Sequence, residues 1–172
     1  MTTSTLTLND VDIAAVGALA DAITTDPVKA DTTWSASVSW DGGFRTTTTI
    51  RDFAPIPTDE PEGLGGGDTA PNPVEQLLGA LGSCLAIGYA ANATAAGIRI
   101  DNLRIDVEGD LNLKSFLGLE PGHAGYDTLR ASVHIESDAT DDAIATLHDT
   151  VVATSPVGHT LAGAIPLTID LK

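Results

Sequence analysis

Cysteine, basic residues and aromatic residues are all scarce in this chain of 172 residues. A single cysteine, Cys84, excludes an internal disulfide. Eight Lys and Arg stand against 24 Asp and Glu, which gives a formal net charge of −16 at pH 7. A surface this acidic repels the phosphates of nucleic acids and anionic lipids. We therefore expect no nucleic-acid partner and no membrane partner.

Hydrophobic residues nevertheless make up 42% of the chain, which is too much for a disordered acidic protein. The length predicts one globular domain over residues 1–172. Most acidic residues are Asp, and lysine occurs only at Lys29, Lys114 and Lys172. This balance favours a halophilic protein kept soluble in concentrated salt, where charges are screened within about 3 Å at 1 M. An acidic surface in an ordinary bacterium is the alternative.

The opening residues 1–4 carry neither the basic flank nor the apolar run of a signal peptide, so we expect a cytoplasmic protein. Residues 76–98 contain no charge and are long enough to cross a bilayer. They are rich in Gly and Ala and lack an aromatic belt, which instead favours a buried central helix. Covering such a helix on all sides in so short a chain calls for a second subunit.

Apolar periodicity and turn residues predict the elements along the chain. An N-terminal helix over residues 9–25, capped by Asn9 or Asp10, forms an extension. After it we expect a hairpin of strands 34–40 and 44–53, a loop over 54–72, the central helix over 73–97, strands 103–107 and 129–135, a helix over 141–153 and a closing strand over 165–171. This order predicts the α+β class, with an antiparallel sheet and a long buried helix.

Cys84 falls in the middle of the central helix, within a stripe of mostly small residues. A buried free cysteine most often only packs. Reactivity there requires a cation from elsewhere that favours the thiolate. Arg45 or Arg51 could supply it, and these residues would lie on one face of a regular strand because they are six positions apart.

Residues 72–85 read NPVEQLLGALGSCL and follow a glycine-rich LGGGD at 64–68. With the order of elements from about Trp34 onward, this motif resembles the OsmC/Ohr family of hydroperoxide-reducing proteins. The resemblance implies an intertwined homodimer with active sites at the subunit interface. It also implies a thiol peroxidase, in which an arginine oriented by a glutamate holds a peroxidatic cysteine as thiolate. That cysteine becomes a sulfenic acid and then forms a disulfide with a second, resolving cysteine.

Carried onto this chain, the peroxidatic position is Cys84. The resolving position, before a Pro-Val pair, is Ser155, so an external thiol must reduce the sulfenic acid. The family's glutamate directly follows the helix-opening proline, where this chain has Val74, and Glu75 comes one residue later. On a regular helix Glu75 lies about 180° around and about 13.5 Å along the axis from Cys84. Stabilising the first turn of the helix is its alternative role.

We therefore expect a cytoplasmic homodimer that reduces organic or inorganic hydroperoxides through Cys84, with an external thiol as reductant and no cofactor. The candidate catalytic residues are Cys84, Arg45, Arg51 and Glu75. The four histidines show no short spacing typical of metal ligands, so we expect no metal. The alternative is a non-catalytic dimer of the same fold that binds a small molecule or senses oxidation.

Overall fold

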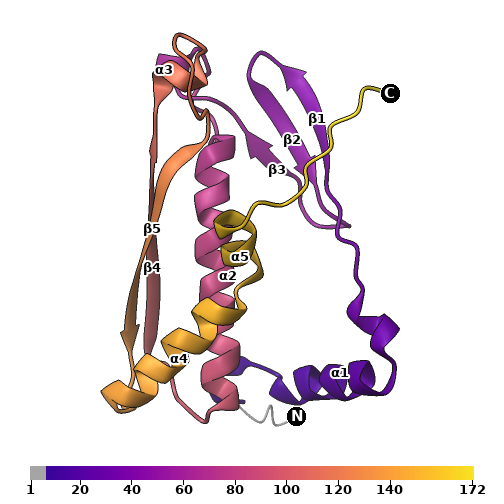
Figure 1. Cartoon of the computed structure of the whole chain (residues 1–172), viewed down its shortest axis with the longest axis vertical. Coiled ribbons are helices and arrows are strands. Elements are labelled where there is room, and N and C mark those ends of the chain that lie inside the picture. Colours follow the sequence, from indigo (N-terminus) through magenta and orange to yellow (C-terminus); the bar gives the residue numbers. More distant parts are fainter. Residues whose placement is uncertain (1–6) are drawn as a thin grey trace, which may run out of the picture. The chain divides into compact units, whose positions relative to one another are not determined.

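The computed structural model describes residues 7–172, which form two compact units (Figure 1). The larger unit contains residues 7–13 and the segment Leu78–Lys172, and the smaller unit is Ala14–Leu77. The single domain over 1–172 stays a prediction. The opening residues 1–4, on which the absence of a signal peptide was argued, lie outside the described residues.

The smaller unit contains a three-stranded antiparallel sheet in the order β1-β2-β3. Its strands are β1 (Ser37–Gly42), β2 (Arg45–Thr49) and β3 (Ile56–Thr58). The predicted hairpin is therefore confirmed, but its second strand ends at Thr49. Arg51 follows in a turn with φ of 49°. The prediction that Arg45 and Arg51 share a strand face is wrong, because the strand does not reach Arg51.

The N-terminal helix α1 (Ile13–Thr25) starts later than predicted, after the short 3-10 helix η1 (Leu8–Asp10) and before η2 (Pro27–Ala30). Asn9 does not cap α1. Its amide group donates to Thr94 Oγ1 and the Ile98 carbonyl, and accepts from the Ile100 backbone N–H. The Asn9 side chain therefore ties the N-terminal segment to the residues around the end of the central helix.

The central helix α2 (Pro73–Ala95) confirms the predicted long helix, and both of its ends follow from the sequence. At the start, Asn72 Oδ1 accepts from the Glu75 N–H and Glu75 Oε2 accepts from the Asn72 N–H, which is a reciprocal capping box. At the end, Gly97 has φ of 72° and donates to the Thr94 carbonyl, while Ile98 donates to Ala93. This is a Schellman motif, and glycine adopts its left-handed residue without strain.

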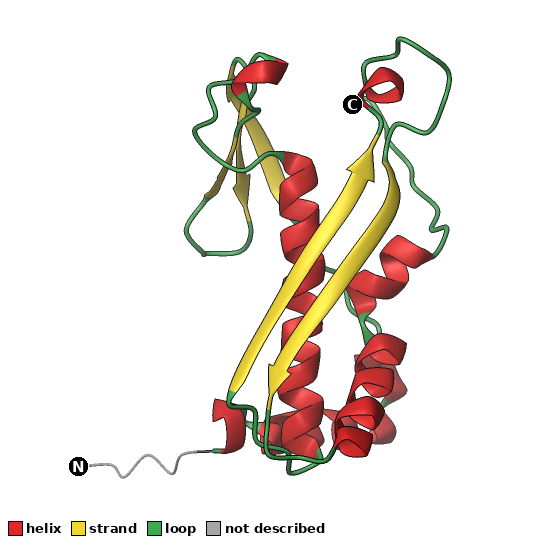
Figure 2. Cartoon of the chain, turned by 90° about the vertical axis from the view of Figure 1, so that its left-hand side faces the viewer, coloured by secondary structure: helices red, strands yellow, loops and turns green. Residues whose placement is uncertain are grey.

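The core of the larger unit lies between α2, α4 (Asp141–Thr154) and the antiparallel pair β4 (Asn102–Leu111) and β5 (Tyr126–Glu136), as Figure 2 shows. A short helix α3 (Leu113–Phe116) lies in the connection between the two strands, and α5 (Pro156–Ala162) follows α4. Alternate strand residues face the core, as predicted, because Leu103 pairs with Ile135 and Ile105 with Val133. The buried apolar side chains of the core are Leu81, Leu85, Tyr89, Ala93, Leu147 and Val151.

Only one face of α2 is buried within the chain. The buried residues Leu81, Leu85, Tyr89 and Ala93 recur every four positions, whereas Ile87 is 69% exposed. Among the described residues, α2 alone is long and apolar enough to cross a membrane by length and composition, a test that the core helix of a soluble protein also passes. That a second subunit covers the exposed face of α2 stays a prediction.

The predicted closing strand over residues 165–171 is wrong. The residues after α5 form no strand, and Ile165, Leu167, Ile169 and Leu171 are each at least 60% exposed. The alternation of apolar and polar residues is present in the sequence. A strand also needs a hydrogen-bonding neighbour, however, and the described part of this chain offers none there.

The loop between β3 and α2, which contains the short helix η3 (Glu62–Leu64), folds around the buried carboxylate of Asp59. Asp59 Oδ2 accepts from the Thr69 hydroxyl at 2.7 Å and from the Gly67 and Thr69 N–H groups at 3.2 Å. The Thr69 hydroxyl and then these backbone donors lower the pKa of Asp59 against the opposing effect of burial. The glycine-rich motif therefore supplies donors to a carboxylate within its own loop.

Gly66 provides a sharp test of this loop. A Cβ at position 66 would lie 1.8 Å from the Glu60 carbonyl oxygen, whereas one at Gly63 would meet nothing within 4 Å. We expect Gly66→Ala to lower the free energy of unfolding by about 1–3 kcal/mol, because the backbone must move. Gly63→Ala is the matched control and should have little effect. Urea denaturation of both variants measures this, and equal stabilities would contradict the packing around Gly66.

Candidate functional site

The sulfur of Cys84 faces the hydroxyl of a serine that is 71 residues away in the sequence. Cys84 lies midway along α2 and is half-buried, and its Sγ is 3.4 Å from Ser155 Oγ. Ser155 is itself buried, at 5% exposure. The structure therefore brings together Cys84 and Ser155, the positions that the resemblance assigns to the peroxidatic and the resolving cysteine.

Local structure fixes the Ser155 hydroxyl. Ser155 lies at the joint between α4 and α5, where it caps the N-terminus of α5 and precedes Pro156 at the first helical position. Its Oγ accepts from the Gly158 N–H at 3.1 Å. Because the oxygen acts as acceptor in that bond, the hydroxyl hydrogen is available to the sulfur of Cys84.

A cavity of about 350 Å³ adjoins this contact. Its walls come from α2, β5, α4 and α5 and are mostly apolar, with Leu81, Leu85 and Leu129 among them. Ser155 and His159 are the polar side chains that line it. His159 Nε2 bonds to the Ala153 carbonyl at 2.9 Å, which leaves its other ring nitrogen for a ligand.

Glu75 is occupied at the start of α2. Its carboxylate accepts from the Asn72 N–H in the capping box described above, and it carries negative charge into the first helical turn. In this position Glu75 stabilises the first turn of α2, which is the alternative role that the sequence indicated for it. Its proposed role in orienting an arginine stays a prediction.

Arg45 and Arg51 differ from the other arginines of the chain. Arg99, Arg104 and Arg130 each form an ion pair with a nearby carboxylate. Arg45 and Arg51 form none with the described residues, and the Arg51 guanidinium instead lies 4.5 Å from the centre of the Phe53 ring. Both belong to the smaller unit, whereas Cys84 belongs to the larger one. Contact of either arginine with the sulfur stays a prediction.

A second polar pair in the larger unit, Tyr89 and His148, has no signal in the sequence. Tyr89 of α2 is 1% exposed, and its hydroxyl lies 2.5 Å from His148 Nδ1 of α4. Burial raises the pKa of Tyr89, so the phenol remains protonated. The spacing of apolar residues places both helices against one core, but it does not reveal that these two side chains meet.

In residues 7–172 we find no group of three or more His, Cys, Asp or Glu that could hold a metal ion. The expectation of no metal and no cofactor stays a prediction.

These features define a class of α+β protein with a long central helix that carries one thiol against a buried hydroxyl. The model of the OsmC-like protein family matches residues 65–170. The chain therefore belongs to the OsmC/Ohr family.

Solved structures share the fold. An OsmC-like protein from Mycoplasma pneumoniae is 22% identical, with a TM-score of 0.67 over 77% of this chain and 89% of that one. An organic hydroperoxide resistance protein OsmC from Legionella pneumophila, described as a predicted redox protein, is 16% identical, with a TM-score of 0.57 over 77% and 93%. A thiocyanate-bound organic hydroperoxide resistance protein from Elizabethkingia anophelis is 15% identical, with a TM-score of 0.58 over 77% and 91%. No curated protein matches this chain.

Proposed function

We propose that this protein reduces organic or inorganic hydroperoxides through the single peroxidatic thiol of Cys84, with an external thiol as reductant. Membership of the OsmC/Ohr family and the names of the hydroperoxide resistance proteins that share its fold support a role in redox stress. The observation that carries the proposal is the Cys84 Sγ to Ser155 Oγ contact at 3.4 Å.

The cycle begins when the Cys84 thiolate attacks the terminal oxygen of the peroxide. An S–O bond forms, the O–O bond breaks, and the alkoxide leaves as an alcohol after gaining a proton. A thiol then attacks the sulfenic acid and releases water, which leaves a mixed disulfide on Cys84. A second thiol attacks this disulfide and restores Cys84. One peroxide and two thiols thus become one alcohol, one disulfide and one water.

Ser155 has a defined task in this cycle. Its oxygen already accepts from the Gly158 N–H, so its hydrogen can donate to the sulfur of Cys84. Hydrogen bonds to the charged form of a group favour that form. In this proposal a serine at the resolving position therefore supports the thiolate but cannot form a disulfide.

Arg45 is the stronger candidate for the cation that the thiolate needs. In a chain with 24 acidic residues, its guanidinium has no carboxylate partner among the described residues. Arg51 remains the alternative, although its guanidinium already lies over Phe53.

Turnover should depend strictly on added thiol. Without thiol, we expect the purified protein to consume about one equivalent of peroxide per chain and then stop, because no second cysteine can reduce the sulfenic acid. Adding a small thiol should restore continuous consumption, which a peroxide assay measures. Continuous turnover without thiol would contradict the proposal. Stoichiometric oxidation that no thiol reverses would favour the redox sensor that the sequence left as the alternative.

We further propose a homodimer in the cytoplasm. The first reason is the uncovered face of α2, where Ile87 is 69% exposed. The second is the extended segment after α5, whose apolar side chains at alternate positions have no strand beside them among the described residues. A second copy could cover both, and light scattering tests the assembly by its mass.

A further inference from the structure

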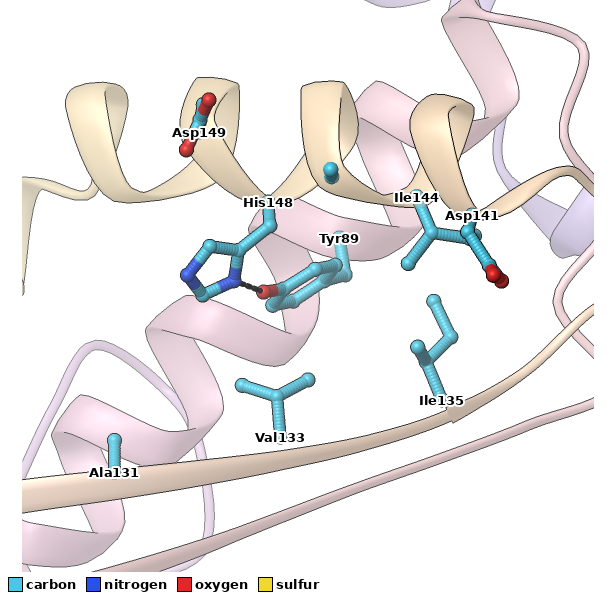
Figure 3. Close-up of a pocket in the computed structure, with 9 residues that line it drawn as sticks. Tyr89, Ala131, Val133, Ile135, Asp141, Ile144, His148 and Asp149 are labelled. Carbon is cyan, nitrogen blue, oxygen red and sulfur yellow. Dashed lines mark hydrogen bonds between the residues drawn. The ribbon is translucent and has the colours of Figure 1, made fainter.

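Away from Cys84, a groove lies between α4 and β5, shown in Figure 3. Its volume is about 450 Å³, which lies in the range of small-molecule sites. Alternate residues of β5 form one wall, with Val133 and Ile135 pointing toward the helix. Residues of α4 spaced by three and four positions share a helix face and form the other wall: Asp141, Ile144, Ala145, His148 and Asp149. The middle of the groove is therefore apolar.

The Tyr89–His148 pair closes one side of this groove. The two rings are tilted by 33° with centroids 6.2 Å apart, and the phenol hydroxyl and Nδ1 form the short contact. Tyr89 is buried, and its hydroxyl shares one hydrogen bond with Nδ1, whose direction depends on the tautomer of His148. His148 is thereby held in one orientation at the groove.

Two carboxylates flank the apolar strip on the α4 side. Asp141 and Asp149 line the groove at either side of His148 along α4. Neither carboxylate forms an ion pair or hydrogen bond with a described residue. They are eight positions apart on the helix, which is about 12 Å along the axis. The groove thus has an apolar centre between two unpaired negative charges.

We propose that this groove binds a small organic cation with an apolar body, such as an alkylammonium. The ammonium group would pair with Asp141 or Asp149, and the alkyl part would lie against Val133, Ile135 and Ile144. Anionic molecules are excluded by the same carboxylates and by the overall charge of −16. This site is separate from the Cys84–Ser155 contact and does not depend on the proposed peroxidase activity.

Three probes with the same six-carbon chain, hexylammonium, hexanol and hexanoate, separate the contribution of charge to binding from that of hydrophobic contact. In titrations of the full chain followed by NMR, hexylammonium should bind saturably and shift signals of Ile144 and Val133. Hexanol should bind at least about fivefold more weakly, and hexanoate should not bind. Equal binding of hexylammonium and hexanol, or binding of hexanoate, would overturn the proposal.

Variants on α4 locate the binding site. Asp149→Asn and Asp141→Asn should each weaken hexylammonium binding by about twofold to fivefold, as expected for exposed ion pairs. Asp142→Asn is the matched control, because it removes the same charge from the same helix but does not line the groove. Ala145→Trp should fill the groove and abolish binding of all probes. If Asp142→Asn weakens binding as much as the groove variants do, or if Ala145→Trp binds normally, the cation does not occupy this groove.

Discussion

Cys84→Ser should abolish peroxide consumption by the purified protein, down to the rate of buffer with the same thiol. The reason is that Cys84 is the only sulfur nucleophile in the chain apart from the start methionine, and a serine hydroxyl does not react with peroxides as a thiolate does. The substitution replaces one small side chain with another, so the fold should remain. The measurement is the rate of peroxide loss with a small thiol in excess.

A double variant tests whether any thiol on α2 is enough for activity or whether the thiol must be at position 84. Ser83→Cys combined with Cys84→Ser moves the sulfur one position along α2, to an exposed residue about 100° around the helix. That thiol would lose the contact with Ser155 Oγ, so we expect no recovery of activity. Full activity of either variant would show that the site described for Cys84 is not responsible.

Ser155→Cys should create an intrachain disulfide with Cys84 once peroxide is added. The present Sγ to Oγ distance of 3.4 Å requires only a small adjustment to reach the S–S bond length of about 2.05 Å. We expect the oxidised variant to lose two hydrogen atoms in mass and to contain no free thiol. Closing a loop of this length stabilises a fold by about 4 kcal/mol in the chain-entropy model.

The same variant should change the reductant that the protein accepts. Its sulfenic acid would be captured by the new thiol at position 155 before an external thiol arrives, so dithiols that reduce disulfides should sustain turnover best. Non-reducing electrophoresis separates the intrachain product from a cross-link between two chains. If the thiols at positions 84 and 155 of this variant both remain free after treatment with peroxide, the two side chains are not close to each other.

The sequence predicted those elements whose signals are local. Asn72, Pro73 and Glu75 define the start of α2, and Gly97 defines its end, because capping depends on residues within one turn. The alternation in β4 and β5 likewise predicted which residues face the core. The family motif identified Ser155 as the partner position of Cys84, which spacing alone could not do across 71 residues.

Several features that the sequence did not predict depend on contacts between residues that are distant in sequence, and Arg51 depends instead on where a strand ends. Asn9 has the side chain of a helix cap, yet it bonds to Thr94, Ile98 and Ile100 instead. Residues 165–171 have the pattern of a strand but no neighbouring strand among the described residues. The Tyr89–His148 pair depends on how two helices pack, and no local signal reports that geometry. Arg51 lies beyond the end of β2, because the strand stops where its pairing with β1 and β3 stops.

The most direct test of the central claim is the mass of the protein after brief treatment with one equivalent of peroxide, with a dimedone-type reagent present to trap sulfenic acid. We predict one trapped adduct per chain, located on Cys84, formed faster than on free cysteine at the same concentration. Ser155→Ala should slow this trapping, because it removes the hydroxyl that faces the sulfur. If Cys84 reacts no faster than free cysteine, or carries no adduct, the thiol is not a peroxidatic nucleophile and the account of this site is wrong.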